Sequence, residues 1–196
     1  MKKLSRLSLM RRVRLLRQLA EVSNCNAATV VGTAILLWCK KDFPSVPKFS
    51  LPISTDLERE PQLIAFVEIL SELDFIDASY WLSTAYAMLS DDTTRKKLAM
   101  FFTPASLTTG LLSDLSDQGV DFSTQSFLDP ACGGAAFLAP IALRMRAALK
   151  CQGWQPKRVL QHIESHLFGT DKDTTLCELS RLFLCMALYE DKGGSR

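Results

Sequence analysis

The sequence predicts an α/β protein with a helical amino-terminal region and a short parallel sheet in its second half. Two observations carry this prediction. Residues 1–98 contain only apolar patterns of the helical kind, whereas two short apolar segments, at 126–129 and 166–171, each precede a helix. The order strand, helix, strand is typical of a parallel crossover unit, which is right-handed in nearly all proteins. We therefore expect two domains, residues 1–98 and residues 99–196.

The helical region begins with a basic block, MKKLSRLSLMRRVRLLRQLA, and continues with an apolar segment at 22–41 that we expect to form a buried helix. A loop with three prolines, DFPSVPKFSLPIS, follows, because proline excludes a regular hydrogen-bonded ladder. The next helix starts at Pro61, and Asp77 is the predicted cap of the helix after it. The residues Asp91-Asp92-Thr93-Thr94 are predicted to cap a short helix, RKK.

In the second half, a helix is predicted to begin at Pro104, with Thr103 as its cap, and to end near Gly119. The elements expected after it are a strand at 126–129, a glycine turn, a helix to about Lys150, a helix at 157–165, a strand in HLFGTD (166–171) and a helix from Thr174 to Tyr189.

Composition excludes few classes of partner. The net charge is +2, from 23 basic and 21 acidic side chains, so no overall field favours nucleic acid, membrane or acidic partners. Seven of the basic residues precede the first acid, Glu21. This block could be a helix with a cationic face, an organelle-targeting segment or sequence upstream of the true start.

The sequence predicts a soluble, cytoplasmic protein. No apolar stretch approaches the roughly 20 residues that span a bilayer, so no membrane partner is expected. Six widely spaced cysteines without a CxxC pair fit reduced thiols better than a disulfide scaffold or a zinc site. The segment HIESH (162–166) lacks the glutamate directly after the first histidine that an HExxH zinc helix requires, so no metal site is expected there.

The stretch FLDPACGGAAFL (127–138) has the order strand, tight turn, helix, with Asp129 at the mouth of the turn. Ligands of open parallel sheets lie beyond the carboxyl ends of the strands, where a glycine turn permits close approach. The second strand ends, after Gly169, in Asp171, a carboxylate placed to accept hydrogen bonds from both hydroxyls of a ribose. Two acids at adjacent strand ends repel a pyrophosphate and suit a cationic or neutral nucleoside.

Three segments in order, FFTP at 101–104, LDPACGGAAFL at 128–138 and FGTDKD at 168–173, resemble motifs of the N6-adenine DNA methyltransferases. That family includes type I modification subunits and fused restriction-modification enzymes, and its motifs are (F/Y)(F/Y)TP, DPACGSGxFL and GxDxD. The resemblance covers roughly residues 60–190. It implies that residues 99–196 are the first part, the cofactor-binding half, of a class I S-adenosylmethionine-dependent methyltransferase fold with a Rossmann-like sheet.

The resemblance also implies the cofactor, S-adenosylmethionine, and the substrate, duplex DNA. Asp129 would meet the methionine end of the cofactor, directly or through water, and Asp171 would bind the ribose. Thr103 would contact the methionine carboxylate at a helix amino terminus, where the helix dipole favours an anion. The implied cofactor-binding residues are Phe102, Thr103, Pro104, Asp129, Ala131, Cys132, Gly133, Gly134, Ala135 and Asp171.

The chain departs from the family at two places. The last glycine of the family's CGSG is here Ala135, and a β-carbon there costs about 1 kcal/mol if the position needs positive φ or close cofactor contact. In addition, the (D/N)PP(Y/F) tetrapeptide that binds the adenine amine is missing: the only asparagines are Asn24 and Asn26, and no two prolines are adjacent.

We therefore expect an amino-terminal portion of a DNA adenine-N6 methyltransferase that is inactive alone. Two alternatives remain open. The chain could be a non-catalytic binding module, a degenerate relic, or it could be one half of a split methyltransferase that a second protein chain completes. A two-stranded parallel fragment has bare edges and an uncovered face, so it should be marginally stable unless completed.

Overall fold

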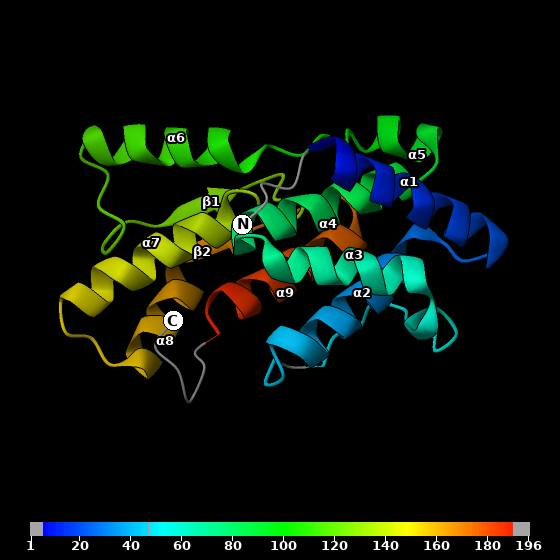
Figure 1. The fold of residues 1–196 in the computed structure, drawn as a ribbon. Helices are drawn as coiled ribbons and strands as arrows, with labels where there is room; N and C mark the ends of the chain where they lie inside the picture. The colour runs from blue at the N-terminus through cyan, green and yellow to red at the C-terminus, as the bar shows by residue number, and fades with distance from the viewer. Residues whose placement is uncertain (1–5, 47, 190–196) are drawn as a thin grey trace. The chain divides into compact units, whose positions relative to one another are not determined.

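The computed structural model describes residues 6–46 and 48–189 (Figure 1). The described chain is a mixed α/β protein, mostly helical, with one small parallel sheet of two strands. It divides into two compact units, unit 1 within Met1–Pro44 and Phe49–Phe102 and unit 2 within Ser45–Lys48 and Thr103–Arg196. We describe each unit by itself.

Unit 1 is helical. Its helices α1, α2, α3 and α4 pack against one another in pairs, with the short helix η1 against α2 and α3. Fully buried side chains from all four long helices form its core, among them Val13, Leu16, Ile35, Phe66 and Leu82. The elements of unit 1 are α1 (Arg6–Val22), α2 (Ala27–Asp42), η1 (Leu57–Arg59), α3 (Pro61–Glu72), α4 (Phe75–Leu89) and α5 (Asp92–Lys97).

Two helix starts in unit 1 differ from the sequence prediction. The apolar segment predicted as one helix over 22–41 begins as α2 only at Ala27, because Asn26 caps it by accepting the Thr29 N–H at 2.8 Å. Helix α4 starts earlier than predicted and is capped by Asp74, which accepts the Ile76 N–H at 2.9 Å. Asp77 lies in the first turn of α4, so its prediction as the cap was wrong. The cap of α5 is Asp91, as predicted.

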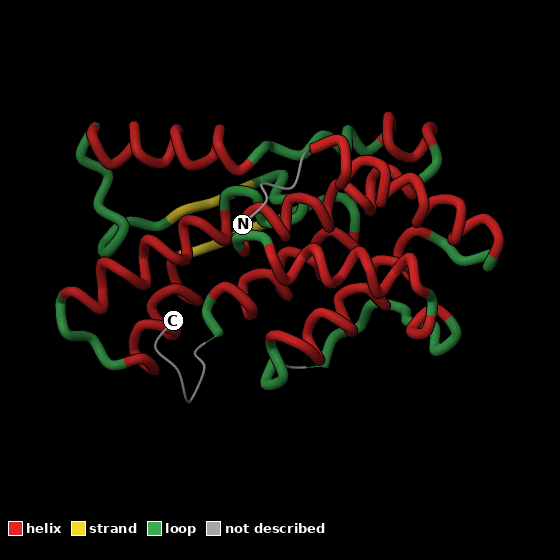
Figure 2. Tube along the Cα trace, viewed as in Figure 1, coloured by secondary structure: helices red, strands yellow, loops and turns green. Residues whose placement is uncertain are grey.

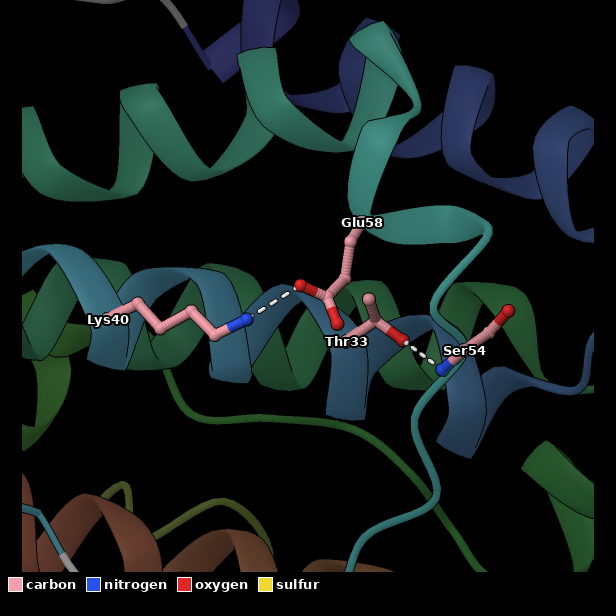
Figure 3. A network of polar contacts seen from close by, with 4 residues as sticks. All are labelled: Thr33, Lys40, Ser54 and Glu58. Carbon is pink, nitrogen blue, oxygen red and sulfur yellow. Dashed lines mark hydrogen bonds and ion pairs between the residues drawn. The ribbon is translucent and has the colours of Figure 1, made fainter.

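The proline-containing loop that precedes α3 packs on α2 (Figure 3). Thr33, fully buried on α2, accepts the Ser54 N–H at 3.0 Å, and Lys40 forms an ion pair with Glu58 at 2.6 Å. Gly32 makes this approach possible, since a β-carbon there would overlap the carbonyl oxygen of Pro52. The hydrogen bond and the ion pair therefore hold the loop against the helix, and Gly32 leaves the space for it.

Unit 2 contains the sheet. Its elements are α6 (Ala105–Asp117), β1 (Phe127–Asp129), α7 (Leu138–Cys151), α8 (Pro156–His166), β2 (Leu167–Gly169) and α9 (Thr174–Ala187). Helix α6 begins one residue later than predicted, because Pro104 has extended dihedrals (φ −61, ψ 145) and occupies the capping position. No side chain caps α6, so the predicted capping role of Thr103 was wrong.

The strands β1 and β2 pair in parallel, which confirms the predicted crossover (Figure 2). Phe127 pairs with Leu167, and this pair packs against the core that α7 and α8 build around Met145, Leu149 and Ile163. Because side chains alternate along a strand, the next pair, Leu128 with Phe168, belongs to the opposite face. Those two side chains are 65% and 49% exposed, so one face of the sheet is covered and the other is open.

Residues 6–20 of the basic block lie in α1, and Leu9, Val13, Leu16 and Leu19 of this helix belong to the core of unit 1. Lys2 and Lys3 lie outside the described residues. Within the described ranges, no single helix has the length and apolar character needed to cross a membrane. One pair of helices, Leu7–Val22 and Ala27–Asp42, meets that test together by length and composition, with a bend of 119° between them.

Candidate functional site

The parallel register places the glycine turn and the residues after β2 at one end of the sheet. Asp129 pairs with Gly169, and the ladder continues past both strands. The Thr170 N–H donates to the carbonyl of Asp129 at 3.0 Å, and the Cys132 N–H donates to the carbonyl of Thr170 at 2.9 Å. The Thr170 hydroxyl also donates to the carbonyl of Pro130 at 3.2 Å. The turn is thus attached to the second strand by three hydrogen bonds to one residue, Thr170, which the sequence analysis did not identify.

Asp171 attaches the turn at a second point. Its Oδ2 accepts the Gly133 N–H at 2.9 Å, and its Oδ1 accepts the Asp173 N–H at 2.9 Å. A carboxylate offers about four lone-pair positions, so each oxygen retains capacity for one further donor. The side chain is half-buried. Asp171 therefore fixes the turn and can still accept two hydroxyl groups.

Asp129 lies at the end of β1 and is half-buried. Its Oδ1 accepts the Ala131 N–H at 3.1 Å, which closes a local turn at the strand end. Its Oδ2 has no hydrogen-bond partner in the part of the chain that the structure describes. The carboxyl end of the sheet thus carries two anionic groups with unused acceptor positions, an arrangement suited to hydroxyl, ammonium or sulfonium groups.

The backbone of the turn uses the left-handed region twice. Gly133 has φ 50, which glycine adopts without steric cost, and Ala135 has φ 60, where its β-carbon is strained. Ala135 is also only 1% exposed, so its methyl group is already covered by the protein. The alanine at this position therefore carries backbone strain that a glycine would not.

Cys132 and Ser180 form the underside of the turn. The buried Ser180 hydroxyl donates to the carbonyl of Gly133 at 2.8 Å and lies 3.4 Å from Sγ of Cys132. Burial raises the pKa of the Cys132 thiol, so this cysteine stays protonated and packs as a small apolar group. The signal for Ser180 in the sequence is weak, a single hydroxyl within the apolar segment LCELSRLFLC of α9.

Gly169 brings β2 close to the start of α7. A β-carbon at Gly169 would overlap Leu138 Cδ1 and lie 3.1 Å from Cys132 Cβ. Gly134 is buried in the same turn. Cys132 of the turn and Leu138 at the start of α7 are therefore packed closely against the second strand.

The FFTP segment spans the boundary between the two units. Phe102 ends unit 1 and Thr103 begins unit 2, both half-buried, and Pro104 is exposed. Within the described chain, no hydrogen bond joins the Thr103 hydroxyl to another group. The structure thus brings together Asp129, Ala131, Cys132, Gly133, Gly134, Ala135 and Asp171. The ligand roles of these residues, like those of Phe102, Thr103 and Pro104, stay predictions.

The two histidines lie near the carboxyl end of α8, which includes His166 and so ends one residue later than predicted. The His162 and His166 rings stack with centroids 3.9 Å apart, and Trp154 packs edge-on against His162. Across the described ranges, no group of three or more His, Cys, Asp or Glu side chains is arranged to hold a metal ion.

Neither a protein-family model, nor a curated protein, nor a solved structure matches this chain.

Proposed function

We propose that unit 2 is the amino-terminal, S-adenosylmethionine-binding portion of a DNA adenine-N6 methyltransferase of the class I fold. One observation supports the proposal most strongly. At the end of the parallel sheet, a hydrogen bond from the Gly133 N–H to Asp171 joins the glycine turn after β1 to the segment after β2. A turn that a ligand can approach, next to a carboxylate with free acceptor positions, suits a nucleoside.

The donor and acceptor groups at this end of the sheet fit S-adenosylmethionine better than a dinucleotide. The carboxylates of Asp129 and Asp171 accept backbone N–H groups. An ionised carboxylate has no N–H or O–H group to donate to a phosphate. Their charges favour the sulfonium and ammonium groups of this cofactor, and the free acceptor positions of Asp171 suit the ribose hydroxyls. When bound, the cofactor would supply an electrophilic methyl group, and the residues of this chain would bind and orient it.

The chain contains no group that matches the family's adenine-binding tetrapeptide. We therefore propose that methyl transfer requires a further segment that carries this tetrapeptide, either in the same protein or in a partner chain. The open sheet face supports this, because parallel sheets are ordinarily covered on both faces and the side chains of Leu128 and Phe168 are 65% and 49% exposed. A relic that binds without catalysis is the competing interpretation.

Isothermal titration calorimetry tests the cofactor proposal. The chain should bind S-adenosylmethionine and its demethylated product, and should not bind NAD. Asp171→Ala should weaken cofactor binding roughly tenfold or more, because hydrogen bonds to a charged acceptor contribute about 1.5–3 kcal/mol. Asp114→Ala, which removes an exposed carboxylate from α6, is the matched control and should bind as the wild type does. Affinities equal in all three proteins would refute the ribose role of Asp171.

Incubation with labelled cofactor and unmethylated duplex DNA tests the need for a second chain. The purified chain should transfer no label, and addition of the product of the adjacent coding sequence should restore transfer if the enzyme is split. Label in N6-methyladenine from the chain alone would contradict the proposal.

A further inference from the structure

The outer side of α1 carries arginines that the fold does not use. Arg11 and Arg14 are exposed, and the Arg17 side chain is 51% exposed. We call these three side chains the arginine ridge. They recur every three residues, so they follow the solvent side of the helix over about 9 Å of its axis.

Few carboxylates neutralise the arginine ridge. Arg17 lies 3.6 Å from Glu21, whereas Arg11 and Arg14 have no ion-pair partner in the portion of the chain that the structure describes. Glu21 is also the only acidic residue of α1. This surface therefore keeps its positive charge locally, although the chain as a whole is close to neutral.

A second group of cations lies beside α1. Arg17 and Thr94 line the same open cavity of about 660 Å³, so α5 begins next to the carboxyl-terminal half of α1 (Figure 1). The last turn of α5 contains Arg95, which pairs with Asp92 at 3.0 Å, and the exposed Lys96 and Lys97. Unit 1 thus carries two groups of cations, separated by a cavity that Glu21 and Asp91 also line.

The apolar face of α1 indicates what kind of partner the arginine ridge binds. An amphipathic basic helix that lies in a membrane surface inserts a free apolar face among the lipids. The apolar face of α1 is occupied, because Leu9, Val13, Leu16 and Leu19 are all buried in unit 1. Guanidinium groups on a firmly packed helix suit a rigid polyanion with regularly spaced phosphates, since each can bind a phosphate through two parallel N–H groups.

We propose that the arginine ridge, together with Lys96 and Lys97, binds the phosphate backbone of duplex DNA. The choice of DNA as the polyanion rests on the function proposed for unit 2, whereas the charged surface lies entirely within unit 1. Contacts of this kind position a protein on the duplex without sequence preference. Unit 1 would thus hold the substrate independently of the cofactor site.

Fluorescence anisotropy of the full chain with labelled duplexes of two unrelated sequences tests the proposal. Affinity should fall as salt rises from about 50 to 200 mM, and neutralising two arginines in R11Q/R14Q should lower the slope of log K against log salt by about two. The loss should be the same for both sequences. R11K/R14K should retain most of the slope, and K157Q/K150Q, which removes two cations from unit 2, should retain all of it.

Thermal melting by circular dichroism checks that each variant is folded. An unchanged slope in R11Q/R14Q, or no binding by the wild type, would overturn the proposal. Binding to vesicles containing phosphatidylserine without binding to DNA would overturn it in favour of a lipid surface. Cofactor titration of the same variants separates the two proposals, because the arginine substitutions should leave cofactor affinity unchanged even if DNA binding is lost.

Discussion

The two units bury their apolar side chains in different ways. In unit 1 the exposed large apolar residues stand at helix ends or in loops, as Leu7, Val22 and Phe101 do. In unit 2 they include the in-register pair Leu128 and Phe168 in the middle of the sheet. A helix buries one stripe against other helices, whereas a parallel sheet has two faces that both require cover. Unit 1 therefore completes its own core, and unit 2 has an open face.

Because unit 1 has a completed core and unit 2 has an open face, an added side chain should destabilise unit 1 more than unit 2. One glycine substitution in each unit tests this. Gly32→Ala should destabilise unit 1 by about 3 kcal/mol, since the new β-carbon would overlap a backbone atom, the carbonyl oxygen of Pro52. Gly169→Ala in unit 2 should cost less, about 1–2 kcal/mol, because the overlapped atom is the movable end of Leu138. Urea unfolding with pulsed hydrogen exchange and mass spectrometry measures each unit separately.

Gly110 provides the control for both substitutions. It lies in α6, and an added β-carbon would have no neighbour within 4 Å. Gly110→Ala should therefore stabilise unit 2 by about 1 kcal/mol through helix propensity alone. If Gly32→Ala left unit 1 as stable as the wild type, the loop before α3 would not be pressed against α2 in solution.

The next largest effect concerns Asp171, which fixes the turn of unit 2. Loss of its two backbone hydrogen bonds in Asp171→Ala should lower the stability of unit 2 by about 2 kcal/mol in the absence of ligand. Asp171→Asn retains only one acceptor oxygen and should lose about half as much. Stability equal to that of the wild type would show that the carboxylate serves a ligand alone.

A smaller effect should distinguish the units by pH, because both histidines belong to unit 2. Burial lowers the pKa of His162 from 6.5, and the nearby charges of His166 and Arg158 lower it further. The backbone of Ser123 opposes this shift of the pKa, but the buried Nε2 itself makes no hydrogen bond in the described chain, so the effect of burial is the largest.

The sign follows from linkage. Below pH 6.5 the unfolded chain binds a proton at His162 that the folded chain resists, so the contribution of His162 to the stability of unit 2 falls as the pH falls below 6.5 and is constant above it. His162→Gln should remove this part of the dependence, whereas unit 1 should show none of it. Urea midpoints for each unit, measured from about pH 7.5 down to pH 5.5, check the prediction. A midpoint for unit 2 that is independent of pH would contradict it.

The sequence predicts the repeating parts of this structure well. Apolar periodicity and turn residues located the helices and both strands, and the order strand, helix, strand was enough for the parallel pairing. The errors at Asn26, Asp74 and Pro104 have one cause, because several adjacent residues can cap a helix and local dihedrals decide among them.

The site was predicted only where its residues belong to a motif. Asp129, Gly133 and Asp171 could be identified from strand ends and glycines, whereas Thr170 and Ser180 could not. Each donates a hydroxyl hydrogen bond to a carbonyl of the turn, and these bonds form only when the fold brings together segments about 40 residues apart. The left-handed backbone of Ala135 is also invisible in sequence, since alanine ordinarily indicates a helix.

That alanine gives the smallest and sharpest test. At φ 60 the change Ala135→Gly should relieve about 1 kcal/mol of strain, and the loss of a buried methyl group should offset most of it at about 0.8 kcal/mol. The net change in the stability of unit 2 should therefore be close to zero. Ala139→Gly is the matched control, because Ala139 is equally buried but lies inside α7.

In the control the two terms have the same sign, so Ala139→Gly should destabilise unit 2 by about 2 kcal/mol. A difference of that size between two Ala→Gly changes four residues apart would isolate the backbone contribution from the packing contribution. Chemical denaturation of both variants provides the measurement, and cofactor titration of Ala135→Gly shows whether relief of strain also tightens binding. If both variants lost the same stability, the turn would hold Ala135 without strain, and its departure from glycine would carry no energetic consequence.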